Sequence, residues 1–163
     1  MAKQKLATLC YFFVDGRILL LHRTKKKNDI HQDKYIGVGG KLESYESPRE
    51  GMMREIFEET GVRPLDLTYR ALIYFKEDGN LDLNPALNYL VFVYTATGFE
   101  GEIVTNSPEG DLLWFTLDEF MQLNLWEGDK IFVPKVVQER SFFEAVFEYT
   151  PAEELLRYLI TEL

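Results

Sequence analysis

The sequence predicts one domain of the α/β or α+β class, a sandwich in which helices pack against a β-sheet. Stretches with strand-like alternation and stretches with helical periodicity follow one another in mixed order along the chain. The 163 residues, of which 46% are hydrophobic, suffice for one packed core, and no repeat or low-complexity linker divides them. We therefore expect residues 1–163 to form a single domain.

The strand predictions begin with a hairpin that turns at Asp15-Gly16, a dipeptide typical of tight turns between strands. Other apolar or alternating runs, bounded by polar segments, predict further strands. The predicted strands cover Lys5–Val14, Arg17–His22, Tyr35–Val38, Leu67–Lys76, Asn88–Thr97, Leu112–Phe115 and Ser141–Tyr149, with loops at Thr24–Asp33 and Glu77–Leu87.

Capping signals place the predicted helices. Ser47 and Glu50 form a capping box around Pro48, and Gly61 is placed to end that helix in a left-handed conformation. A second box at Thr150–Glu153 predicts a helix from there to the C-terminal Leu163. The remaining predicted helices are Leu117–Leu123 and Asp129–Arg140, the latter restricted or bent by Pro134.

Composition limits the possible functions. The net charge of −9 argues against nonspecific nucleic-acid binding, which requires a basic surface, but it permits a small anionic substrate held through a bound metal ion. The single Cys10 lies in an apolar strand, so we expect a buried thiol and no disulfide within the chain. We see neither a membrane-length apolar stretch nor a signal peptide, and we expect a cytoplasmic protein without a membrane partner.

The most informative segment is Gly40 to Val62, which reads GKLESYESPREGMMREIFEETGV. Within it, Glu55, Glu58 and Glu59 occupy positions i, i+3 and i+4 of the predicted helix, so their carboxylates share one face. Three negative charges on one face repel one another, and a bound divalent cation would relieve that repulsion. The alternative is a surface helix with a solvated acidic face.

This segment resembles the Nudix box at every fixed position. The matching positions are Gly40, Glu46, Arg54-Glu55, Ile56, Glu58-Glu59 and Gly61-Val62. A glycine common before the first glutamate of the box is replaced by Tyr45, and we expect an altered loop because Tyr tolerates positive φ poorly. The resemblance implies a mixed sheet between helices, and hydrolysis of nucleoside diphosphates linked to another moiety with Mg²⁺ or Mn²⁺.

The resemblance extends beyond the box, from about Leu6 to about Tyr149. Lys34–Leu42 is similar to the segment that enters the box in the MutT-like 8-oxo-dGTP diphosphatases, and Trp126–Asp129 is similar to their base-recognition segment. The implied reaction is hydrolysis of 8-oxo-dGTP, or a related purine nucleoside triphosphate, to the monophosphate and pyrophosphate.

The resemblance also implies a set of catalytic and metal-binding residues. The implied metal ligands are the carboxylates of Glu55, Glu58, Glu59 and Glu109 and the main-chain carbonyl of Gly39. Arg54 is expected to position a carboxylate and to join Glu46 to the helix. Which carboxylate acts as general base, and how many metal ions bind, stays open.

The implied substrate-binding residues are Thr8, Arg23, Tyr74, Trp126 and Asp129. Two polar positions of the vertebrate base pocket are different here, because Ile36 replaces an asparagine and Gly128 replaces one of two acids. A site with fewer hydrogen bonds discriminates less well, so we expect modest selectivity for an oxidised base. His22 and His31 have no ligand-like spacing and are interpreted as ordinary polar residues.

Three functions are therefore compared. The first is a purine nucleoside triphosphate pyrophosphohydrolase. The second is a Nudix enzyme for another substrate, such as ADP-ribose or a dinucleoside polyphosphate, which often carries a Pro or Tyr shortly after the box where this chain has Glu77-Asp78-Gly79-Asn80. The third is a non-catalytic nucleotide-binding module, in which the box is usually degraded, whereas here it is intact. The oligomeric state is not predicted.

Overall fold

A large mixed β-sheet forms the centre of the computed structural model, which describes residues 4–77, 88–139 and 141–163. The strands are β1 (Lys5–Val14), β2 (Arg17–Arg23), β3 (Tyr35–Ile36), β4 (Val38–Lys41), β5 (Arg63–Leu65), β6 (Thr68–Glu77), β7 (Tyr89–Ala96), β8 (Gly98–Glu100), β9 (Asn106–Ser107), β10 (Gly110–Thr116), β11 (Phe143–Tyr149) and β12 (Leu155–Glu162). The helices are α1 (Pro48–Thr60), α2 (Leu117–Phe120) and α3 (Glu127–Gln138).

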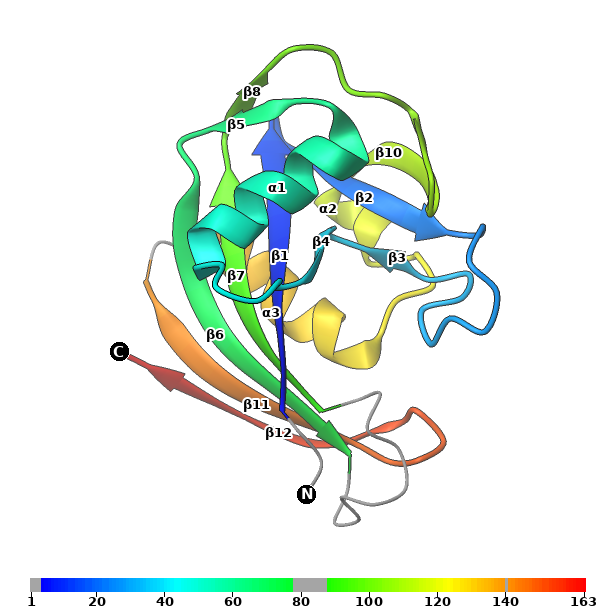
Figure 1. Ribbon diagram of the computed structural model, residues 1–163. Helices are drawn as coiled ribbons and strands as arrows, with labels where there is room; N and C mark the ends of the chain where they lie inside the picture. The colour runs from blue at the N-terminus through cyan, green and yellow to red at the C-terminus, as the bar shows by residue number, and fades with distance from the viewer. Residues whose placement is uncertain (1–3, 78–87, 140) are drawn as a thin grey trace.

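The sheet order is β12-β11-β6-β7-β1-β2-β10-β9, with β3 beside β2 and β4 beside β1, while β5 and β8 pair separately. The pairs β1–β7 and β6–β11 are parallel, and the others are antiparallel. Helix α1 lies on one side of this sheet and α3 on the other (Figure 1). The predicted α/β/α sandwich with a mixed sheet is therefore confirmed.

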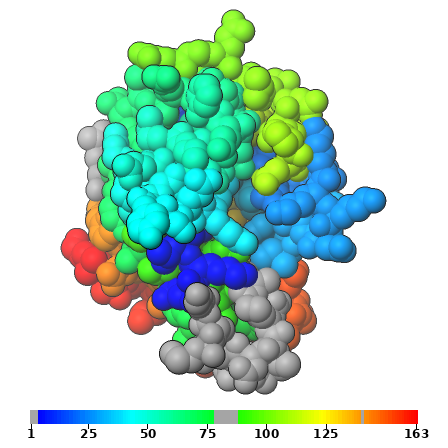
Figure 2. Space-filling model, in the orientation of Figure 1, coloured from blue at the N-terminus to red at the C-terminus, as the bar shows by residue number. Residues whose placement is uncertain are grey.

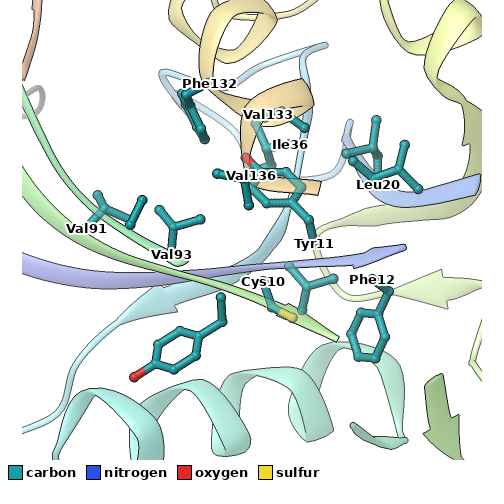
Figure 3. Close-up of a cluster of buried hydrophobic side chains, with 14 of the residues drawn as sticks. Cys10, Tyr11, Phe12, Leu20, Ile36, Val91, Val93, Phe132, Val133 and Val136 are labelled. Carbon is teal, nitrogen blue, oxygen red and sulfur yellow. The ribbon is translucent and has the colours of Figure 1, made fainter. Parts of the chain in front are cut away.

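The core fills both sides of β1, because successive side chains of a strand point to opposite faces. Cys10 and Phe12 point towards α1, whereas Tyr11 points towards α3 and packs edge-on against Phe132 (Figure 3). The Cys10 thiol is fully buried and free, as predicted. Neither α1 nor α3 is both long and apolar enough to cross a bilayer.

Most predicted elements appear in the structure with boundaries shifted by a few residues. The hairpin at Asp15-Gly16, the capping box of α1 and the left-handed Gly61 (φ 76°) are confirmed. The short strand predicted at Tyr35–Val38 is divided into β3 and β4. Residues 78–87 of the loop predicted at Glu77–Leu87, and the predicted helix end at Arg140, lie outside the described residues.

The predicted C-terminal helix is wrong, because the segment forms strand β12, which pairs antiparallel with β11. Thr150 still bonds the residues after it, and its Oγ1 accepts from the backbone N–H of Glu154 at 3.2 Å. The backbone N–H of Thr150 in turn donates to the carbonyl of Glu154 at 2.8 Å, so this motif closes a hairpin turn. Pairing with an apolar neighbouring strand outweighs the weak local preference for a helix.

The loop before α1 contains an unusual backbone conformation at Tyr45. Its φ is 67°, and its side chain is fully exposed. The left-handed region costs a residue other than glycine roughly 1 kcal/mol or more. The structure thus keeps the positive φ that a glycine would adopt freely, and the Tyr45 side chain makes no buried contact in compensation.

We predict that Tyr45→Gly stabilises the fold. Relief of the left-handed conformation should contribute about 1 kcal/mol, or a rise in Tm of about 2–4 °C for a domain of this size. Thermal denaturation followed by circular dichroism measures the shift. Tyr45→Ala is the control, because it removes the same exposed ring but keeps a Cβ. An equal rise in both variants would show that the ring, not the backbone, causes the strain.

Candidate active site

Helix α1 brings the box carboxylates to one place, and an arginine fixes its start. The Nε of Arg54 donates to Oε1 of Glu46 at 2.6 Å and its Nη2 donates to Oε2 at 2.9 Å, a two-point contact. This contact lowers the pKa of Glu46 to about 2. Glu46 also accepts from the backbone N–H of Glu43 at 2.9 Å. The predicted connection between the loop and the helix through Glu46 and Arg54 is confirmed.

The same Arg54 side chain holds two further carboxylates. Its Nη1 donates to Oε1 of Glu55 at 2.9 Å and to Oε2 of Glu58 at 3.2 Å. The Glu58 side chain is 55% exposed, whereas that of Glu55 is 15% exposed. Burial raises the pKa of Glu55 despite the hydrogen bond from Arg54. Arg54 therefore neutralises part of the acidic face in this state of the protein.

Glu59 is turned inward and is the most buried member of the cluster, with 6% of the residue exposed. The backbone N–H of Gly39 donates to its Oε2 at 3.0 Å. Burial, together with the charges of Glu109 and Glu55, raises the pKa of Glu59 to about 9. Without a bound cation, the carboxyl group of Glu59 therefore favours its protonated form.

Two glycines let β4 approach both β1 and α1. A Cβ at Gly39 would lie 1.9 Å from the carbonyl oxygen of Thr8, and a Cβ at Gly40 would lie 2.5 Å from the carboxylate of Glu55. Only glycine fits at Gly39, where the clash is with backbone atoms, whereas a Cβ at Gly40 would require the Glu55 carboxylate to move. The Oγ1 of Thr8 donates to the carbonyl of Gly40 at 3.4 Å and helps to hold the two strands together.

The donor set suits a hard divalent cation in its chemistry, since carboxylate and carbonyl oxygens are the ligands that Mg²⁺ prefers. Burial, and after it the negative charges of Glu109 and Glu55, raise the pKa of Glu59, so a bound cation would favour its ionised form. Among residues 4–77, 88–139 and 141–163, however, no three acidic, histidine or cysteine side chains converge as a finished metal site. Arg54 instead binds the carboxylates of Glu55 and Glu58, and the N–H of Gly39 binds that of Glu59.

A cavity of about 630 Å³ begins at this cluster and runs towards α3. At one end it is lined by Gly39, Gly40, Arg54, Glu55 and Glu109, and at the other by His31, Ile36, Phe75, Trp126, Asp129 and Tyr149. The loop of residues 24–33 and the segment around Glu109 lie beside the α1 region on the surface (Figure 2). A second, more open hollow of about 520 Å³ on the far side of Trp126 contains no box residue.

Trp126 is held in place from three directions. Its indole Nε1 donates to Nδ1 of His31 at 2.9 Å, and the Nζ of Lys34 lies 4.8 Å from the indole ring centroid. The ring of Tyr149 meets it at 82° with 5.3 Å between centroids. Asp129 follows in the first turn of α3 and is buried, and burial raises its pKa to about 7.

Arg23 lies between the two ends of the cavity. Its Nε donates to Oδ2 of Asp29 at 2.8 Å, and its Nη1 lies 3.0 Å from Oε2 of Glu109. Its side chain and that of Asp29 are both nearly inaccessible to solvent. Arg23 is therefore bound by two carboxylates and holds Glu109 beside the box.

The structure brings together most residues that the sequence singled out. Lining the cavity are Thr8, Arg23, Gly39, Arg54, Glu55, Glu109, Trp126 and Asp129. Tyr74 is not among the lining residues, and its neighbour Phe75 lines the cavity instead, because adjacent side chains of β6 point to opposite faces. Neither Glu58 nor Glu59 lines the cavity. The carboxylate of Glu59 accepts a hydrogen bond from the backbone N–H of Gly39, which is a lining residue.

Sequence reasoning missed two residues of this region. His31 was interpreted as an ordinary polar residue, yet it bonds Trp126 and lines the cavity. Asp29 was assigned only to a polar loop, yet it pairs with Arg23. The Trp126–His31 bond has no local sequence signal, since it joins residues 95 positions apart.

Comparisons with known proteins agree with this geometry. Residues 3–136 match the family model of the NUDIX domain. Over its full length the chain is 28% identical to the oxidized purine nucleoside triphosphate hydrolase of Mus musculus, covering 98% of that protein. It is also 28% identical over 152 residues to the uncharacterized Nudix hydrolase YvcI of Bacillus subtilis, covering 93% of this chain and 90% of that protein.

A solved structure supports the same assignment. The crystal structure of a mutator MutT protein from Bacillus halodurans superimposes with a TM-score of 0.80 and 30% identity, over 96% of this chain and 97% of that one. The family match covers most of the chain, and the intact box lies within it. The chain belongs to the Nudix family, with a MutT-like fold, and is a pyrophosphohydrolase of that family.

Proposed function

We propose that this enzyme hydrolyses purine nucleoside triphosphates, with 8-oxo-dGTP or a related oxidised purine as the preferred substrate, to the monophosphate and pyrophosphate. The observation that carries this proposal is one cavity that joins the carboxylates of Glu55 and Glu109 to the side chains of Trp126 and Asp129 at the start of α3. Such a cavity suits a ligand with phosphates at one end and a flat base at the other. The oxidized purine nucleoside triphosphate hydrolases among the relatives support it.

The phosphate end would hold Mg²⁺ or Mn²⁺ on the carboxylates of Glu55 and Glu59, with Glu58 and Glu109 beside them and the main-chain carbonyl of Gly39. A bound dication supplies charge neutralisation for the phosphates and a water of lowered pKa. In the proposed reaction, a water oxygen bonds to one of the two phosphorus atoms of the α–β phosphoanhydride while the P–O bond to the bridging oxygen breaks. The products are the monophosphate and pyrophosphate, and the proton lost by the water passes to solvent. Arg54 positions Glu55 and Glu58, and Arg23 positions Glu109.

The base end would hold a purine between apolar side chains and a few polar groups. Trp126, Phe75 and Tyr149 offer aromatic surface, and Asp129 offers a carboxyl group whose raised pKa allows it to donate as well as accept. Thr8 would contribute to substrate binding indirectly, by holding β4 in place through its hydrogen bond to Gly40, between the phosphate end and the base end of the cavity. In this proposal Phe75 takes the aromatic role that the sequence assigned to Tyr74.

The reaction itself provides the test of this proposal. A panel of 8-oxo-dGTP, dGTP, dATP, ADP-ribose and a dinucleoside polyphosphate, each with Mg²⁺, should give the highest kcat/KM for 8-oxo-dGTP. The released product should be pyrophosphate, and water labelled with heavy oxygen will show which phosphorus is attacked. Release of orthophosphate as the first product, or faster hydrolysis of ADP-ribose, would contradict the proposed substrate but not the family.

We predict that Glu59→Gln keeps the fold and lowers kcat by at least about 100-fold, because the amide is nearly isosteric but lacks the charge that a dication requires. Phosphate or pyrophosphate release in Mg²⁺ measures the loss, with circular dichroism as the check on folding. Glu102→Gln is the matched control, since Glu102 is exposed and distant from the cavity lining. Near-normal turnover by Glu59→Gln, or by the parent protein in EDTA, would exclude the assigned role.

The same substitution should stabilise the metal-free protein at alkaline pH. The ordinary pKa of this carboxyl is 4.5 and its folded pKa is raised to about 9, so the folded state holds a proton that the unfolded chain releases. The fold therefore loses stability as the pH rises between these values, and Glu59→Gln avoids this loss. At pH 8.5 in EDTA we expect the variant to be more stable by roughly 1–3 kcal/mol.

Thermal denaturation at pH 5 and pH 8.5 measures this effect. The difference in Tm between the variant and the parent should increase towards pH 8.5. Mg²⁺ should reduce this difference, because it should stabilise only the parent. Parallel pH profiles for the two proteins would mean that Glu59 does not titrate in this range.

A further inference from the structure

The hydrogen bond between Trp126 and His31 fixes the state of the imidazole. The indole N–H can only donate, so Nδ1 of His31 must accept, and the ring proton must lie on Nε2. No described residue bonds that Nε2 atom, although His31 lines the cavity. His31 therefore has one donor to offer to whatever occupies the base end.

The position of His31 is fixed by its backbone as well as by Trp126. Its backbone N–H donates to Oδ1 of Asp29 at 3.1 Å, and its carbonyl accepts from the N–H of Lys34 at 2.9 Å. Asp29 is in turn held by the buried Arg23. A side chain held by its own backbone and by a buried ion pair is preorganised to bond a ligand without further ordering.

The surroundings also keep His31 neutral. Burial and the nearby charges of Arg23, Lys34 and Lys26 lower its pKa to about 4, and the opposing charge of Asp29 does not offset them. A neutral imidazole with Nδ1 as acceptor and Nε2–H as donor is therefore the form present at physiological pH.

We propose that His31 is a specificity-determining residue, whose Nε2–H donates to an acceptor, such as a carbonyl oxygen, on the edge of a purine seated at Trp126. This inference rests on the proposed function and deepens it. Ile36 lines the same end of the cavity with no polar group, and Gly128 offers no side chain, so hydrogen bonds to a base must come from other lining residues, such as His31, Asp129 and Tyr149. His31 supplies, together with Asp129, the hydrogen bonding that distinguishes purines with a carbonyl edge from adenine.

Two variants separate the donor from the contact with Trp126. His31→Asn keeps a carbonyl oxygen near the place of Nδ1 and removes the Nε2 donor, whereas His31→Gln can place an amide N–H near the position of Nε2. We expect His31→Asn to raise KM for 8-oxo-dGTP and dGTP by about 5- to 20-fold with little change in kcat, and to leave dATP almost unaffected. His31→Gln should recover part of the loss.

A binding measurement provides a readout that does not depend on turnover. Titration calorimetry with 8-oxo-dGMP and with dAMP should show the same selective loss of affinity in His31→Asn, while thermal denaturation confirms that each variant folds. Unchanged KM values and an unchanged preference between the bases would overturn the role of His31, as would an equal fall for all substrates through kcat. If the parent protein neither hydrolyses nor binds purine nucleotides, the proposed function itself fails, and this role fails with it.

Discussion

The site depends on the burial of one carboxylate against one backbone N–H, that of Glu59 against Gly39. This contact exists because β4 contains two glycines where any larger residue would overlap Thr8 or the Glu55 carboxylate. It places a carboxyl group where little solvent reaches it and where the charges of Glu109 and Glu55 add to the energetic cost of ionising it. A protein tolerates such a destabilising group when a bound ligand compensates its charge, and active sites commonly lower the stability of the fold in this way.

The arginines distribute the remaining charge. Arg54 binds Glu46 in the loop before α1 and binds Glu55 and Glu58 with the same guanidinium, so it connects the loop to the helix. Arg23 joins Glu109 at the phosphate end to Asp29, whose backbone contact orients His31 at the base end. The two ends of the cavity are therefore connected through buried polar contacts, and a change at one end has a physical route to the other.

Features that depend on contacts between residues close in sequence could be predicted, whereas features that depend on contacts between distant residues could not. Helix α1 was predictable because Ser47, Glu50 and Gly61 act within one turn of the helix ends. The C-terminal strand was not, because its pairing with β11 outweighs a capping signal at Thr150 that is local and weak. The sequence assigned Tyr74 to the cavity, but its neighbour Phe75 lines it, because alternate side chains of a strand point to opposite faces of the sheet. The role of His31 required knowing that a residue 95 positions away would lie beside it.

The central claim is that the box carboxylates, freed from Arg54 and Gly39, together bind a dication. Crystals grown with Mn²⁺ and a non-hydrolysable purine nucleotide test this claim most directly, through the anomalous signal of the metal. We expect a peak in direct coordination with carboxylate oxygens of Glu55 and Glu59 and with the carbonyl of Gly39. The Arg54–Glu55 contact should be loosened, and the base should lie beside Trp126 and His31. Absence of an ordered metal there, with Glu59 still bonded to the N–H of Gly39 and Arg54 still bonded to Glu55, would contradict it.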